Sequence, residues 1–90
     1  MYIWDEEKAA NNLAKHGVAF EAIYGFDWGT AYVVEDGRFD YGEQRSIAFG
    51  LIGEYLHVLV YTVRNHLIRV ISLRRANRRE RALYAKAQNP

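Results

Sequence analysis

Cysteine is absent from this sequence of 90 residues, and proline occurs only once. A chain without cysteine forms no disulfide, no thiolate metal site and no catalytic thiol. No apolar run approaches the roughly 20 residues that span a bilayer as a helix, and the first residues are acidic, unlike a signal peptide. We therefore expect a single cytoplasmic domain over residues 1–90, without a membrane segment.

Histidine is scarce as well. The three histidines lie far apart and lack the close spacing of a metal-binding pair, so we expect neither a metal site nor a cofactor. Hydrophobic residues make up 50% of the chain and aromatic residues 14%, which is enough for a small core.

Charge is divided unevenly along the chain. Residues 1–45 carry four basic and nine acidic side chains, for a net charge of −5, whereas residues 46–90 carry eight basic and two acidic side chains, for +6. Most of the positive charge lies between Arg64 and Lys86. A basic segment of this kind indicates binding to phosphates or to an acidic protein, although a solvated helix face gives the same pattern.

The most regular pattern is a pair of apolar runs, Tyr55–Arg64 and Leu67–Leu73, separated by Asn65-His66. Their Val, Leu, Ile, Tyr and Thr content is typical of strands, and Asn and His tolerate positive φ, so the pattern predicts a hairpin with a two-residue turn. The predicted opposite pairs are Val63 with Ile68, Thr62 with Arg69, and Val60 with Ile71. Alternation then places Arg64 and Arg69 on one face, and His57, Ser72 and Arg74 on the other.

Helix signals flank this hairpin on both sides. Asp5 is a good N-cap for a helix that ends near His16, with Gly17 after its last turn. Asn77 and Glu80 have the spacing of a capping box and begin a C-terminal helix.

The remaining elements complete the predicted fold. Residues 18–27 indicate a second short helix, Trp28–Glu35 and Gln44–Leu51 indicate strands, and residues 38–42 form a polar and aromatic loop. Met1–Trp4 is a short edge strand or an extended arm. The predicted architecture is α+β, with two N-terminal helices, a four-stranded antiparallel sheet and a C-terminal helix.

An ordered set of residues carries a resemblance to a known family. The set comprises Trp4-Asp5, Lys15-His16-Gly17, Phe20, Gly42-Glu43-x-Arg45, Gly50, Arg64, Arg69-x-Ile71-Ser72-x-Arg74-x-Ala76 and Glu80-x-x-x-Tyr84. In this order, over nearly the whole chain, these residues resemble the BrnT family of toxins. The resemblance implies a RelE-like fold, cleavage of RNA and arrest of translation. It also implies a BrnA-type antitoxin, a ribbon-helix-helix protein, in a 2:2 complex that contacts operator DNA through the antitoxin.

Cleavage of RNA without a metal requires a base for the 2′-OH, cations for the charged phosphorane and an acid for the leaving oxygen. The candidate catalytic residues are Arg64, His16, Lys15, Arg69 and Glu43. Arg64 is the candidate for the scissile phosphate, because a guanidinium binds two phosphate oxygens; alternatively it pairs with Glu43 at the sheet edge. Arg69 is a second cation or flanks the turn in solvent.

His16 suits proton transfer at neutral pH, although a cation in the last turn of a helix also stabilises the helix dipole. Lys15 contacts a phosphate or is a solvated charge, and Glu43 is a general base or holds Arg45 and Arg64 in place. The candidate RNA-binding residues are Arg74, Arg75, Arg78, Arg79 and Arg45, which would grip backbone phosphates in a salt-sensitive manner.

Other functions are compatible with the same fold, because fold does not determine activity. One is a non-catalytic module that only binds an antitoxin or RNA. Another is a gyrase poison, for which DNA breaks with intact RNA would be the signature.

Overall fold

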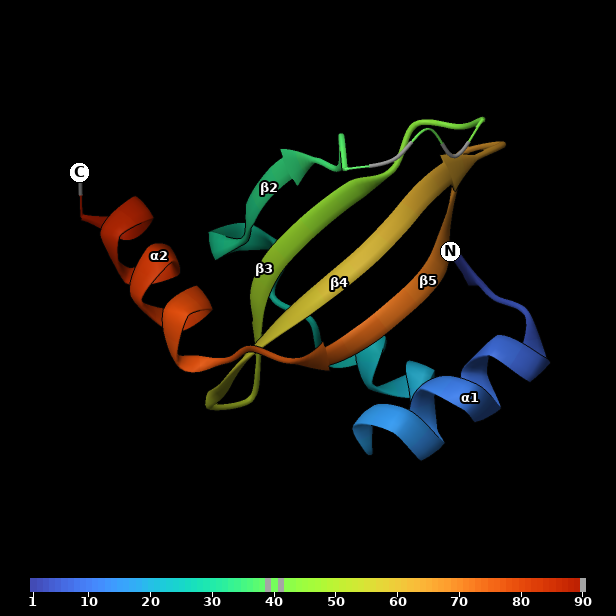
Figure 1. Cartoon of the computed structure of the whole chain (residues 1–90), viewed down its shortest axis with the longest axis horizontal. Helices are drawn as coiled ribbons and strands as arrows, with labels where there is room; N and C mark the ends of the chain where they lie inside the picture. The colour runs from blue at the N-terminus through green and yellow to red at the C-terminus, as the bar shows by residue number, and fades with distance from the viewer. Residues whose placement is uncertain (39, 41, 90) are drawn as a thin grey trace.

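The computed structural model describes residues 1–38, 40 and 42–89 (Figure 1). Its elements in chain order are β1 (Tyr2–Ile3), α1 (Glu6–His16), the 3₁₀ turns η1 (Phe20–Gly25) and η2 (Trp28–Thr30), β2 (Tyr32–Glu35), β3 (Ser46–Ile52), β4 (Tyr55–Arg64), β5 (Leu67–Arg75) and α2 (Arg78–Gln88). The predicted α+β class is confirmed. The loop predicted at residues 38–42 lies partly outside the described residues.

Both predicted helix boundaries near the N-terminus are confirmed. The Asp5 side chain accepts hydrogen bonds from the backbone N–H groups of Glu7 and Lys8, at 2.8 and 3.1 Å. Gly17 ends α1 with φ 71°, and its N–H donates to the carbonyl of Leu13 at 2.8 Å. A left-handed residue at this position favours glycine, because a Cβ would be strained there.

The predicted second helix is wrong in type and length. The chain forms η1 and then η2, so β2 begins at Tyr32 rather than at Trp28. The buried side chains of this segment are Phe20, Ile23 and Phe26, which recur every three residues. A 3₁₀ helix has three residues per turn, so residues at this spacing lie on one side of η1 and its continuation.

The Phe26 ring lies directly over Gly50 of β3. A Cβ placed on Gly50 would lie only 2.8 Å from the ring carbons Cε1 and Cε2 of Phe26. Only a residue without a side chain therefore allows this aromatic ring to approach the sheet so closely.

Within the described residues, the sheet has five strands in the order β1-β5-β4-β3-β2, rather than the predicted four. The four predicted strands are antiparallel neighbours, but β1 adds a parallel strand beside β5, so the sheet is mixed. The parallel contact joins Tyr2 to Ile68 and Ile3 to Arg69. The prediction for Met1–Trp4 was a short edge strand or an extended arm, and the structure contains the edge strand, at Tyr2–Ile3.

The predicted turn is confirmed, because Asn65 and His66 both have positive φ, at 52° and 65°. The predicted register is confirmed close to this turn and wrong beyond it. Val63 pairs with Ile68, and Thr62 pairs with Arg69, but Val60 pairs with Ser72 rather than with Ile71. The pairing shifts between Val60 and Tyr61, so that β5 has one extra residue there, as in a β-bulge.

Because of the bulge, the side chains at the end of β5 lie on the opposite faces of the sheet from those predicted. Side chains alternate with a period of two, so one extra residue exchanges the two faces. Arg74 now pairs with Val58 and lines a pocket together with Val58 and Val60. Ser72 and Arg74 were predicted to share a face with His57, and that prediction is wrong.

The two faces of the sheet are covered unequally. One face packs against α1 and η1 through Phe20, Ile23, Leu59, Val70 and Leu73, all less than 2% exposed. The other face has a smaller cluster formed by Phe49, Leu56, Val58 and Ala76, with Tyr84 of α2 packed against it. Figure 1 shows α2 at one end of the sheet.

A buried asparagine joins α1 to β5. The Asn12 amide donates to the carbonyls of Leu73 and Val18, at 2.7 and 3.0 Å, and its oxygen accepts from the N–H of Leu73 at 3.2 Å. Because β1 covers only the first part of β5, this side chain satisfies backbone groups that a longer neighbouring strand would otherwise bind.

Among the described residues, no helix is both long and apolar enough to cross a membrane.

Candidate active site

The predicted catalytic residues fall into separate groups. Arg64 and Glu43 lie at the turn end of β4, whereas Lys15 and His16 lie beside β5 at the end of α1. Ser72, which lines the pocket of His16, pairs with Val60, and Arg64 is four residues farther along β4. At the rise of an extended strand, the backbone positions of Val60 and Arg64 are roughly 13 Å apart.

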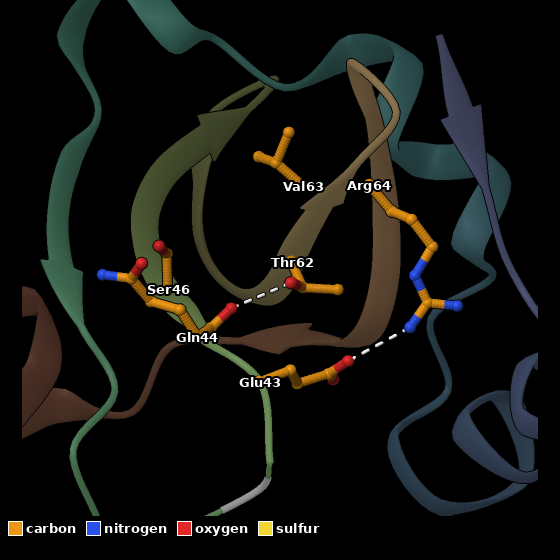
Figure 2. A pocket seen from close by; sticks show the side chains of 6 residues that line it. All are labelled: Glu43, Gln44, Ser46, Thr62, Val63 and Arg64. Carbon is orange, nitrogen blue, oxygen red and sulfur yellow. Dashed lines mark hydrogen bonds and ion pairs between the residues drawn. The ribbon is translucent and has the colours of Figure 1, made fainter.

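The first group surrounds a pocket of about 410 Å³, which we name the turn pocket (Figure 2). It is lined by Glu43, Gln44, Ser46, Thr62, Val63 and Arg64. Glu43 accepts a hydrogen bond from Nη2 of Arg64 through Oε1 and one from Nε of Arg45 through Oε2, both at 3.1 Å. The Thr62 hydroxyl donates to the carbonyl of Gln44 at 2.8 Å and ties this loop to β4.

The two arginines make Glu43 a weak base. The hydrogen bond from Arg45, followed by the charges of Arg45 and Arg64, lowers the pKa of the Glu43 carboxyl below its usual value. A base with a low pKa accepts a proton poorly at neutral pH. The structure therefore contains the ion pair that was the alternative for Arg64, while the Arg64 side chain stays 52% exposed and accessible to a ligand.

The second group surrounds a pocket of about 260 Å³ between α1 and β5, which we name the helix pocket. It is lined by Lys8, Asn11, Asn12, Lys15, His16, Ile71 and Ser72. Burial, and then the charges of Lys15 and Arg74, lower the pKa of His16 below its ordinary value. A lowered pKa favours the uncharged imidazole, which is the form that can accept a proton.

A third hollow, of about 150 Å³, lies on the face of the sheet toward α2, and we name it the face pocket. Ile47, Phe49, Val58 and Val60 form its apolar floor, and Arg38, Ser72, Arg74 and Glu80 lie around it. Ser72 lines both the helix pocket and the face pocket, so the two meet at the β5 bulge. Nη1 and Nη2 of Arg74 donate to Oε1 and Oε2 of Glu80, at 2.8 and 2.7 Å.

Arg38 is a residue of the face pocket that the sequence-based reasoning missed. Its Nε and Nη2 donate to the carboxylate of Asp36 at 2.8 and 2.9 Å, and Asp36 is buried. The only local signal is the Asp36-Gly37 turn directly before this arginine. A turn signal says nothing about which distant residues the next side chain will face.

The remaining candidates are spread over the surface: the catalytic candidate Arg69, and the RNA-binding candidates Arg75, Arg78 and Arg79. Arg69 pairs with Thr62 across the hairpin and is half-buried. Arg75 lies with its guanidinium carbon 3.9 Å from the centre of the Tyr55 ring, a cation–π contact at the far end of the sheet. Arg78 and Arg79 are exposed at the start of α2.

The predicted capping box is confirmed. The Asn77 side chain accepts from the N–H of Glu80, and the Glu80 side chain accepts from the N–H of Asn77, both at 2.8 Å. Glu80 therefore both begins α2 and holds Arg74.

Stability in acid should depend on Glu80. Its hydrogen bond from Arg74, and then the one from Asn77, lower the pKa of the Glu80 carboxyl. A lowered carboxyl pKa stabilises the fold above the ordinary glutamate value, and this stabilisation is lost as pH falls through the lowered value. Glu80→Gln keeps a cap but loses the charge, so we expect a loss of about 0.5–1 kcal/mol at pH 7 that shrinks in acid. Thermal melts of both proteins from pH 7 to pH 3 measure this; a pH-independent difference would contradict it.

Across residues 1–38, 40 and 42–89, no three His, Asp or Glu side chains are grouped so that they could hold a metal ion.

Comparison with known proteins identifies the family. A family model described as the ribonuclease toxin, BrnT, of type II toxin–antitoxin systems matches residues 4–80. A search of curated proteins found no match. The matched range contains every residue that lines the turn, helix and face pockets. The resemblance predicted from the sequence is confirmed: the chain belongs to the BrnT family of ribonuclease toxins of type II toxin–antitoxin systems.

Proposed function

We propose that this chain is a metal-independent endoribonuclease that inhibits translation by cutting RNA. The observation that carries the proposal is the position of His16 in a pocket whose charged lining residues, Lys8 and Lys15, are both cationic. These cations attract the RNA phosphate, while burial and the charges of Lys15 and Arg74 lower the pKa of the imidazole and favour the form that accepts a proton.

The proposed reaction starts at the ribose 2′-OH. The His16 imidazole takes the proton of this hydroxyl, and its oxygen forms a bond to the adjacent phosphorus. The positive charges of Lys8 and Lys15 stabilise the phosphorane. The bond from phosphorus to the 5′ oxygen then breaks, and Lys15 protonates the leaving oxygen. The products are a 2′,3′-cyclic phosphate and a 5′-hydroxyl, and solvent returns the proton from His16 to Lys15.

We assign the turn pocket to substrate binding rather than to proton transfer. Arg64 is exposed enough to contact a backbone phosphate, and Glu43 orients Arg64 and Arg45 through its two oxygens. Arg69, Arg74, Arg75, Arg78 and Arg79 extend the basic surface on which further phosphates can bind.

The partner follows from the family, because a type II system includes a protein antitoxin. We propose that it is a BrnA-type ribbon-helix-helix protein in a 2:2 complex, and that it alone contacts operator DNA. The exposed arginines at the start of α2 suit an acidic segment of such a partner. We expect the toxin to act in the cytoplasm, where RNA is translated.

Purified protein, freed of any partner and incubated with a structured RNA in EDTA, tests the proposal. We expect cleavage that survives the chelator and leaves 2′,3′-cyclic phosphate ends. For Arg64→Ala we expect KM to rise about tenfold with little change in kcat, because one charged phosphate contact is lost. Lys86→Ala removes one exposed charge from α2 and should behave as the wild type.

Two outcomes would contradict the proposal. Cleavage that disappears in EDTA would point to a metal-dependent nuclease. Folded protein that binds RNA without cutting it would favour the non-catalytic binding module, and DNA breaks with intact RNA in cells would favour a gyrase poison.

A further inference from the structure

Two arginines around the face pocket are held in the same way. Arg38 comes from the loop after β2, and Asp36 binds it through two side-chain hydrogen bonds. Arg74 comes from β5, and Glu80 of α2 binds it through two hydrogen bonds. Bidentate pairing fixes the plane and direction of a guanidinium, so each arginine is pre-oriented before any ligand arrives.

The two guanidinium groups repel each other. The hydrogen bonds from Glu80 raise the pKa of Arg74, but the charge of Arg38 acts on the same group in the opposite direction. Both side chains line one pocket of about 150 Å³. An anion bound between two like charges turns their repulsion into attraction, so this arrangement favours a phosphate.

The floor of the face pocket is apolar but little exposed. Phe49 and Val58 are only 7% and 3% exposed, and Ile47 and Val60 are half-buried. A pocket of about 150 Å³ with its charged groups at the sides therefore suits a single phosphate rather than a whole nucleotide.

We propose that the face pocket binds one phosphate of the RNA backbone, between Arg38 and Arg74. This inference rests on the proposed function in one respect: Ser72 lines both the face pocket and the helix pocket, so the bound phosphate lies near the bond that is cut. Arg38 is then an RNA-binding residue, and Asp36 and Glu80 position the two guanidinium groups.

Equilibrium binding tests this assignment without any need for cleavage. The probe is a mixed-sequence oligonucleotide with 2′-fluoro sugars, which lacks the attacking hydroxyl, and fluorescence anisotropy is measured at several salt concentrations. For Arg38→Gln we expect Kd to rise about tenfold. We also expect the slope of log K against log salt to become shallower by about 0.7, the value for one phosphate on a single strand. Lys86→Ala should change neither quantity.

A second variant distinguishes a lost phosphate contact from a loss of folding. Arg38→Gln removes the guanidinium that pairs with the buried Asp36 carboxylate, which by itself costs stability. Asp36→Asn combined with Arg38→Gln leaves a neutral pair at the same place, and we expect the same loss of affinity and of salt slope. Circular dichroism confirms folding of each variant. An unchanged Kd and salt slope in both folded variants would overturn the proposed phosphate contact.

Cleavage and binding, measured together, distinguish this proposal from the proposed function. If the wild type cuts no RNA but the salt slope of binding is shallower for Arg38→Gln, the proposed nuclease is rejected and the phosphate site is retained. If the wild type cuts RNA and Arg38→Gln has the same Kd and KM as the wild type, only the phosphate site is rejected.

Discussion

Replacement of His16 by alanine is expected to lower the cleavage rate by about 10²–10⁴, the usual contribution of a positioned acid–base group. Burial and the neighbouring charges lower the pKa of this histidine, which supports the proposal that it is the proton acceptor of the helix pocket. The rate is measured under single-turnover conditions, so that binding and product release do not obscure the chemical step. His66→Asn is the matched control, because His66 is exposed and Asn tolerates its positive φ.

The alternative role for His16 is a cation that stabilises the end of α1. His16→Lys separates the two roles, because lysine keeps a positive charge near the helix end but offers no neutral base at pH 7. We expect His16→Lys to be as inactive as His16→Ala and to remain folded. Full activity in either variant would show that His16 is not the base, and the turn pocket would then be the candidate for the catalytic site.

The same assignment predicts the pH dependence of cleavage. A base must be deprotonated to act, so the wild-type rate should fall only when the pH drops below the lowered pKa of His16. Arg74→Gln removes one of the charges that lower this pKa, so the acidic limb of the profile should move to higher pH. An unchanged limb in Arg74→Gln would show that another group controls the rate.

Asn12→Ala is expected to lower the free energy of unfolding by about 3–5 kcal/mol, because it leaves buried backbone groups without hydrogen-bond partners. The lost contacts are those to the N–H and carbonyl of Leu73 and to the carbonyl of Val18. Leu73 is fully buried, so water cannot easily replace the missing partner. Urea unfolding followed by circular dichroism gives the value.

The adjacent Asn11 is the matched control for this substitution. Asn11 is exposed on the same helix, and alanine is a better helix former, so Asn11→Ala should change stability by no more than about 0.5 kcal/mol. If Asn12→Ala is as stable as Asn11→Ala, the buried amide does not hold the edge of β5. Because Ser72 and Arg74 flank Leu73, we also expect weaker RNA binding by Asn12→Ala even at temperatures where it remains folded.

The sequence by itself determined the features that depend on neighbouring residues. Asp5 with Gly17, Asn65-His66, and Asn77 with Glu80 mark a helix, a turn and a second helix correctly, because caps and turns form within a few residues. The ordered motifs also identified the family, which the family model confirms over residues 4–80.

The tertiary structure decided what depends on distant residues. The alternation of apolar and polar residues in the sequence does not predict the bulge near Ile71. Its one extra residue places Arg74 on the opposite face, where it lines the same pocket as Arg38. Asn12 and Leu73 are 61 positions apart, and their hydrogen bonds exist only because α1 packs on β5. The predicted catalytic set is divided for the same reason: Arg64 and Glu43 line the turn pocket, Lys15 and His16 line the helix pocket, and Arg69 lines neither. A motif orders residues along the chain, whereas packing and strand register decide which of their side chains meet.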